Sequence, residues 1–339
     1  MKMRNLTLVL LLAFLVCLNC TDEQAQGVVS KPASKISGLA LMPVHTNIVF
    51  YTNFENLKQT PFGNELRAKF EDHVNLEEDD ADYRDFVEKT GFDWNRNMQE
   101  MWISTIAVQE GKSQGGAIVQ AKFNKDRILD YLRTEHRHKF EKDSYKGFDI
   151  YVSNDHDENA LAFLNSETVA VGKQQWLEMV LDQKKSSRKN VLNNAEMTEL
   201  VNRVPENSQI WGVFNLEKIT DEWAEHIRKS GSHFKGSKSL ENIESLIFYS
   251  QVGQKANTTV EGNFSTNEQA QLLADMLNGF KAMAKLAVMD DREAIDMLNE
   301  IKINVEGERL KINANLDQAF FDKLEKNKKK FGSKNLDWM

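Results

Sequence analysis

One pattern of secondary structure occurs twice along this chain. Its first copy consists of two alternating strands and an amphipathic helix, predicted at residues 101–109, 116–123 and 125–134. Its second copy has the same elements in the same order, at 243–252, 258–264 and from Thr266 onward. Each copy follows another strand that runs into a turn bearing Asn and Glu, at 47–57 and 208–219. This repeat predicts two similar modules.

Additional hairpins and helices complete each predicted module. Alternating residues and tight turns predict a strand at 145–152 and hairpins at 160–171 and 301–316. Helical spacing predicts helices at 61–76, around Trp176, and at 318–331. The predicted fold is α+β, with two modules of antiparallel sheet and helices packed mainly on one face. We place the modules at residues 39–195 and 196–339.

The N-terminal residues have the features of an export signal. Lys2 and Arg4 precede an apolar run at 6–18, and the chain turns polar directly after Cys20. We expect residues 1–19 to be a signal peptide and 20–38 a flexible tether. Cys20 stands where bacterial lipoproteins are cleaved and acylated, so we expect a lipid on Cys20 to anchor the protein to a membrane of the cell envelope.

The residues before Cys20 depart from the usual lipoprotein motif. Cys17 stands where that motif has Leu, and Asn19 where it has Gly, Ala or Ser. An ordinary cleaved signal is the alternative, and the product would then be a soluble secreted protein. Thr21-Asp22-Glu23 resembles a short acidic tag that sends some Bacteroidetes lipoproteins to the outer face of the cell. The periplasmic side and the outer face therefore both remain open.

Charge and cysteine content limit the partners and the sources of stability. The formal net charge of the chain is −8, and loss of Lys2 and Arg4 with the signal makes it −10. An acidic surface repels phosphate backbones, so we expect no nucleic-acid partner. Because Cys17 and Cys20 are the only cysteines, the folded body has no disulfide. Its sequence has no later span of about 20 apolar residues.

The order of short motifs resembles a family of secreted or lipidated bacterial proteins with a duplicated α+β domain of unknown function. The matching residues are Met42-Pro43-Val44-His45-Thr46, Tyr145-Lys146-Gly147, Ala162-Phe163-Leu164-Asn165, Val169-Ala170-Val171-Gly172 and Val204-Pro205-Glu206-Asn207-Ser208. The resemblance covers residues ~40–320 and rests on short elements. It implies an α+β fold and an envelope location, and it carries over no catalytic residue.

Three histidines are the candidate metal ligands. His136 and His138 are two residues apart, which would place both on one face of a strand, and His156 lies among acidic residues. The alternative is that both segments are solvated, since one is mostly charged and the other is a polar turn.

Residues 155–158 (DHDE) and 77–80 (EEDD) offer acid–base groups, but we expect these groups to be exposed, with ordinary pKa values. The sequence has no nucleophile elbow, no glycine-rich phosphate loop and, after Cys20, no cysteine pair. We therefore expect no cofactor. A hydrolase using carboxylates or His156 remains the alternative function.

The helix at 270–289 carries apolar residues over more than one face, which exceeds what packing on one sheet requires. One hypothesis is a hydrophobic binding site there, with Met276, Phe280 and Met283 as candidate ligand-binding residues. The alternative, which we favour, is a helix wedged between the modules and buried on both sides. The sequence as a whole predicts a noncatalytic envelope lipoprotein that binds a partner protein or an apolar ligand.

Overall fold

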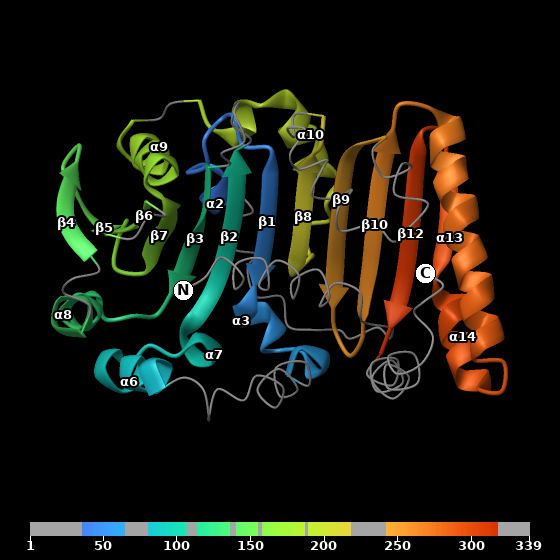
Figure 1. Cartoon of the computed structure of the whole chain (residues 1–339), viewed down its shortest axis with the longest axis horizontal. Coiled ribbons are helices and arrows are strands. Elements are labelled where there is room, and N and C mark those ends of the chain that lie inside the picture. Colours follow the sequence, from blue (N-terminus) through green and yellow to red (C-terminus); the bar gives the residue numbers. More distant parts are fainter. Residues whose placement is uncertain are drawn as a thin grey trace. The chain divides into compact units, whose positions relative to one another are not determined.

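A computed structural model describes residues 36–64, 81–106, 114–135, 140–154, 158–186, 189–217 and 242–317 (Figure 1). The described chain divides into two compact units. The N-terminal unit holds described residues up to 206, apart from residues 60–63. The C-terminal unit holds residues 60–63 and the described residues from 207 onward. Each unit has its own strands and helices.

The N-terminal unit has an antiparallel sheet of order β1-β2-β3-β7-β6-β5-β4. Its strands are β1 (Ile48–Asn53), β2 (Met98–Ile106), β3 (Gln114–Ala121), β4 (Phe140–Tyr145), β5 (Phe148–Ser153), β6 (Asn159–Phe163) and β7 (Thr168–Lys173). Its helices are α2 (Ile36–Leu39), α3 (Phe54–Leu57), α6 (Ala81–Thr90), α7 (Trp94–Asn97), α8 (Lys125–Glu135), α9 (Gln174–Lys185), the 3₁₀ turn η1 (Val191–Asn193) and α10 (Ala195–Arg203).

The C-terminal unit has an antiparallel sheet of order β8-β9-β10-β12-β11. Its strands are β8 (Ile210–Asn215), β9 (Ile243–Val252), β10 (Ala256–Phe264), β11 (Lys302–Glu306) and β12 (Arg309–Leu316). Its helices are α13 (Asn267–Ala287) and α14 (Arg292–Glu300). The long helix α13 packs along β10, β11 and β12, as the orange ribbon in Figure 1 shows.

The strands of the two units share one connectivity. In each unit an opening strand pairs with the first strand of a hairpin, and the second strand of that hairpin pairs with the last strand of a later hairpin. Thus β8-β9-β10-β12-β11 follows the same path as β1-β2-β3-β7-β6. The pair β4–β5 is an addition in the N-terminal unit. The repeat predicted from the sequence is present in the connectivity of the strands.

Helices lie on both faces of the N-terminal sheet. On one face, Trp176 of α9 donates its indole N–H to Ser104 Oγ at 2.9 Å and lies over Gly116. A Cβ at Gly116 would lie 2.5 Å from the Trp176 ring, so this glycine allows the close packing. The pairing register puts Tyr151 on the opposite face, where α8 lies. The predicted α+β class is confirmed, but the helices here are not mainly on one face.

Several predicted elements correspond to observed ones, and others lie outside the described residues. The strand predicted at 243–252 is β9, and Thr266 caps α13, its Oγ1 accepting from the N–H of Gln269 at 3.3 Å. Of the helix predicted at 61–76, only residues 61–64 are described, and they are helical. The helix predicted at 318–331 lies outside the described residues. Within the described residues, no helix is both long enough and apolar enough to span a bilayer.

Candidate functional site

Helix α13 buries one side and exposes apolar residues on another. Its inner side places Ala270, Leu273 and Ala274 against Phe264 of β10 and Leu310 of β12. These residues recur at helical spacing, so one stripe of the helix forms the core of the C-terminal unit. Burial of this stripe fixes which residues point outward.

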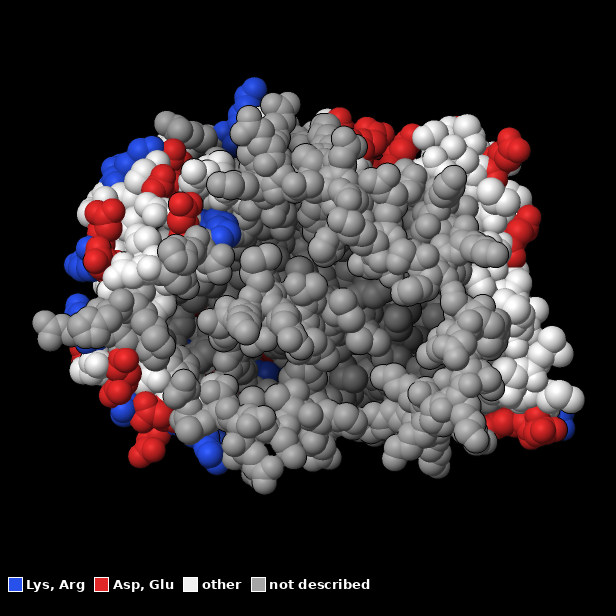
Figure 2. Space-filling model, viewed as in Figure 1, with Lys and Arg blue, Asp and Glu red and all other residues white. Residues whose placement is uncertain are grey.

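The outward stripe of α13 is also apolar. Leu272, Met283 and Leu286 are exposed by 60%, 44% and 69%. With Gly279 and the half-buried Met276 at the border of the stripe, they are spaced alternately four and three residues apart, the spacing of a seam that packs against another helix. We call these five residues the α13 face. Figure 2 shows mostly uncharged atoms along this edge, bordered by acidic atoms. Exposed apolar residues gathered in this way are typical of interaction sites.

The three residues predicted to bind an apolar ligand differ in their exposure. Met283 is exposed, whereas Met276 and Phe280 are half-buried, and Met276 packs against the core of the unit. The interpretation of a helix buried on both sides is wrong, because the outward side of α13 is exposed. Each of these residues lies on α13, but only part of the set reaches the surface.

A groove in the N-terminal unit lies between α8 and the strands β4 and β5. Its volume is about 370 Å³, and its lining combines apolar, aromatic and cationic side chains: Leu129, Leu132, Arg133, Phe140, Lys142 and Tyr151. We call it the α8 groove. Lys142 and Tyr151 are directly opposite each other in the β4–β5 pair, so both point to the same face of the sheet. The groove therefore has a floor of strand residues and a wall of helix residues.

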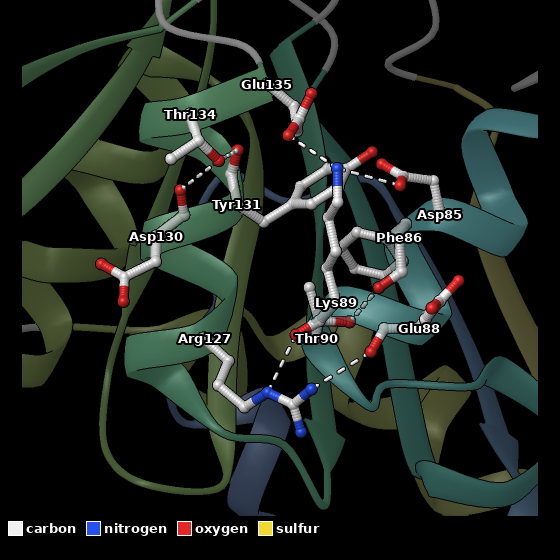
Figure 3. Close-up of polar contacts among 10 residues, drawn as sticks. All are labelled: Asp85, Phe86, Glu88, Lys89, Thr90, Arg127, Asp130, Tyr131, Thr134 and Glu135. Atoms are coloured by element: carbon white, nitrogen blue, oxygen red, sulfur yellow. Dashed lines mark hydrogen bonds and ion pairs between the residues drawn. The ribbon is translucent and has the colours of Figure 1, made fainter.

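Helix α6 holds α8 in place (Figure 3). Arg127 donates to the carbonyl oxygens of Lys89 at 2.8 Å and Glu88 at 3.1 Å, in the last turn of α6. Carbonyls there have no partner within the helix, and a cation stabilises that end of the helix dipole. Gly91 follows with a φ of +73°, a conformation that favours glycine after a helix end. This end of α6 is thus fixed to α8.

Aromatic and ionic contacts also join α6 to α8. The rings of Phe86 and Tyr131 meet edge to face with centroids 5.2 Å apart. Lys89 lies between Asp85 and Glu135, with N–O distances of 2.9 and 2.6 Å, and all three side chains are partly exposed (Figure 3). Exposed pairs of this kind contribute little stability, so the aromatic contact is the stronger link. Together these contacts set the position of Leu129, Leu132 and Arg133 along the groove.

A buried polar cluster lies on β1 and β2. Asn53 Nδ2 donates to Tyr51 Oη and to Glu100 Oε1, both at 3.1 Å. Glu100 is only 4% exposed, and its Oε2 is buried with no hydrogen-bond partner in the described part of the chain. Burial raises the pKa of Glu100 to about 7, the charge of Glu55 adds to this, and a hydrogen bond with Tyr51 opposes it. Burial, and then the charge of Glu100, raise the pKa of Tyr51.

This cluster was not predicted from the sequence, although a signal was present. In the alternating strand β2, Glu100 has the same phase as Met98, Trp102 and Ser104, all of which are buried. A perturbed carboxylate is a candidate acid or base. However, none of the residues lining the α8 groove belongs to the cluster, and the hydrogen bonds of Glu100 go to neighbouring strand residues. The geometry supports a structural role in pairing β1 with β2.

The remaining predicted site residues lie outside the described residues. They are Cys20, His136, His138 and His156. Among the residues that are described, no group of three or more His, Cys, Asp or Glu side chains has the geometry to hold a metal ion.

Comparison with known proteins gives distant similarities. No protein-family model matches the chain. An uncharacterised protein of Methanocaldococcus jannaschii, MJ0635, is 23% identical over 197 residues, which are 58% of this chain and 61% of that protein. The match therefore spans about three fifths of the length of that relative. The crystal structure of TP0453 (crystal form I) is similar with a TM-score of 0.44 and 11% identity, covering 84% of this chain and 93% of that one.

Proposed function

We propose that this protein is a noncatalytic lipoprotein of the bacterial cell envelope that binds an amphipathic helix of a partner protein through the α13 face. The observation that carries the proposal is the exposure of Leu272, Met283 and Leu286 on one stripe of a helix whose other side already forms the core. These exposed side chains add nothing to the stability of the C-terminal unit, because apolar side chains stabilise a protein only when they are removed from water.

The spacing of the α13 face favours a helix as the partner. Alternating steps of four and three residues keep apolar side chains on one line along a helix, and a second helix can pack its own side chains between them. Gly279 lies at the middle of this line, and a Cβ built there would have no atom within 4 Å. A partner backbone can therefore approach α13 most closely at Gly279.

The N-terminal sequence supports the membrane part of the proposal. An apolar run after Lys2 and Arg4 that ends at Cys20 is the pattern of a lipoprotein signal. Acyl chains on Cys20 would hold the folded units near the bilayer, with residues 21–38 as the tether. A partner would then be met at the membrane surface, where the local concentration of both proteins is raised.

Intact mass spectrometry tests the anchor. Protein extracted gently from its host's membranes is expected to have the mass of residues 20–339 plus three acyl chains. The variant Cys20→Ala is expected to lose the acyl mass and leave the membrane fraction. A mass that fits an unlipidated chain cut at another bond would overturn the anchor and make a secreted protein the correct description.

Site-specific photocrosslinking tests the partner. A photoreactive residue at Leu286 is expected to give one protein adduct in host cells, with the crosslinked peptide mapping to an amphipathic helix. The matched control places the same residue at Asn278, which is exposed on another side of α13. Met283→Lys should remove the adduct at Leu286. Adducts to lipid alone, or equal adducts from both positions, would contradict a helical protein partner.

A further inference from the structure

The α8 groove has the composition of a site for an amphipathic anion, and this observation is independent of the α13 face. Leu129, Leu132 and Phe140 give it apolar walls. Tyr151 is 95% buried, and its side chain forms part of the lining. A hydroxyl in the lining can donate a hydrogen bond to a bound molecule.

Two cations lie at the groove. Arg133 and Lys142 both line it, from α8 and from β4. Both cations have acidic neighbours outside the lining: Arg133 Nη1 is 3.4 Å from Asp130, Lys142 Nζ is 2.8 Å from Asp149, and Asp149 also interacts electrostatically with Arg133. These pairs are exposed, and exposed pairs exchange partners at little cost in free energy. Both cations therefore retain donors for an incoming anion, and the guanidinium group is suited to a carboxylate.

The size of the groove limits what it can hold. Its volume of about 370 Å³ is near the lower end of ligand pockets, which span roughly 300–1,000 Å³. At roughly 30 Å³ for each water-sized group, the groove has room for about twelve non-hydrogen atoms. A carboxylate with an alkyl chain of about ten carbons fits this limit. A phospholipid with two long chains would extend well beyond the groove.

We infer that the α8 groove binds a medium-chain fatty carboxylate, with its alkyl chain against Leu129, Leu132 and Phe140 and its head group between Arg133 and Lys142. The Tyr151 hydroxyl donates a hydrogen bond to the same carboxylate. The apolar walls supply most of the binding free energy, since each methylene leaves water on binding. The two cations select an anion over a neutral or cationic molecule with the same chain.

Isothermal titration calorimetry with decanoate is the direct test. The folded chain is expected to bind one decanoate. Decanol has the same chain without the charge, and it should bind at least about tenfold more weakly, because charge-assisted hydrogen bonds are lost. Decyltrimethylammonium should not bind at the groove. Equal affinity for decanoate and decanol would indicate unspecific partition and would overturn the inference.

Variants place the binding at the groove. Arg133→Gln and Lys142→Gln are each expected to weaken decanoate binding by about tenfold. Tyr151→Phe removes only the hydroxyl and should weaken binding by roughly threefold to tenfold. Lys122→Gln is the matched control, because Lys122 is an exposed cation just before α8 and does not line the groove. An equal loss of affinity in Lys122→Gln would show that only overall charge matters.

The α13 face is the other apolar surface that a fatty chain could use. Leu286→Asp changes that face and leaves the groove unchanged, so decanoate binding should be unaffected. If Leu286→Asp abolishes binding while Arg133→Gln does not, the chain binds at α13 and the inference about the groove is wrong. Absence of any decanoate binding to the wild type would contradict it as well.

Discussion

Asn53 and Glu100 are paired across β1 and β2, and the Asn53 amide donates to Glu100 with Nδ2 3.1 Å from Oε1. This bond satisfies one oxygen of a carboxyl group that is 4% exposed, while the other oxygen has no partner in the described residues. A buried carboxylate with one unpaired oxygen is costly in its charged form. The native state therefore favours the protonated form of Glu100.

This preference makes stability depend on pH. The pKa of Glu100 is about 7 in the folded protein, against 4.5 for an exposed glutamate. Between these values the native state binds more protons than the unfolded state, so the free energy of unfolding falls as pH rises. We expect ionisation of Glu100 to lower the free energy of unfolding by about 3 kcal/mol from pH 4.5 to pH 8. Most of this decrease should be complete just above pH 7. Urea unfolding at a series of pH values measures this loss.

Glu100→Gln separates this contribution from those of other groups. Glutamine keeps an acceptor for Asn53 and cannot ionise. The difference in unfolding free energy between variant and wild type should grow in favour of the variant from pH 5 to pH 8. Parallel pH profiles for the two proteins would show that Glu100 does not carry the dependence.

The bond between Trp176 and Ser104 joins α9 to the sheet. Trp176 is fully buried, and its indole N–H donates to Ser104 Oγ at 2.9 Å. Ser104→Ala would leave that N–H buried without its acceptor, which costs about 1–3 kcal/mol. The loss is measured by urea unfolding. Ser144→Ala, at an exposed position on β4, is the control and should change stability by less than about 0.5 kcal/mol. Similar values for both variants would contradict the importance of this bond.

Arg127 is expected to hold the end of α6 on α8. Arg127→Ala removes two hydrogen bonds to α6 carbonyls and should lower the free energy of unfolding by roughly 1 kcal/mol. Amide exchange in α6 should accelerate more than exchange in β2, because the lost contacts are local. The control Arg133→Ala removes a cation six residues further along α8, whose ion pair in the described part of the chain is with Asp130 of the same helix. Equal acceleration in both variants would mean that Arg127 has no special role.

The strands were predictable where local pattern and tertiary burial agree. In β2, every second residue is buried, and alternation in the sequence reports this directly. In contrast, β4 has only a weak strand signal in the sequence, because Glu141, Lys142, Asp143 and Ser144 are all exposed and β4 is the last strand in the order of its unit. Its pairing with β5 comes from the turn at Lys146-Gly147, where both residues have positive φ.

The candidate sites also differ in how far the sequence predicts them. The all-round apolar character of α13 marked Met283 from the sequence, but only the packing on β10 and β12 shows which side is outward. The α8 groove could not be predicted, because it depends on β4 lying beside β5 under α8, and Arg133 and Tyr151 are distant in the sequence. The glutamate at position 100 could have been flagged by its phase in β2, since its neighbours of equal phase are buried.

A substitution at Gly279 has separate effects on the stability of α13 and on its proposed function. Glycine in a helix interior costs about 1 kcal/mol relative to alanine, and a Cβ at this position would meet nothing within 4 Å. Gly279→Ala should therefore raise the free energy of unfolding by about 0.5–1 kcal/mol, measured by urea unfolding. If a partner helix packs at the middle of the α13 face, the added methyl keeps the two backbones apart, and the photocrosslink from Leu286 should weaken. Ala282→Gly, on the same helix but outside the face, should lower stability and leave the crosslink unchanged. A crosslink that is as strong in Gly279→Ala as in the wild type would mean that no helix approaches α13 at this glycine.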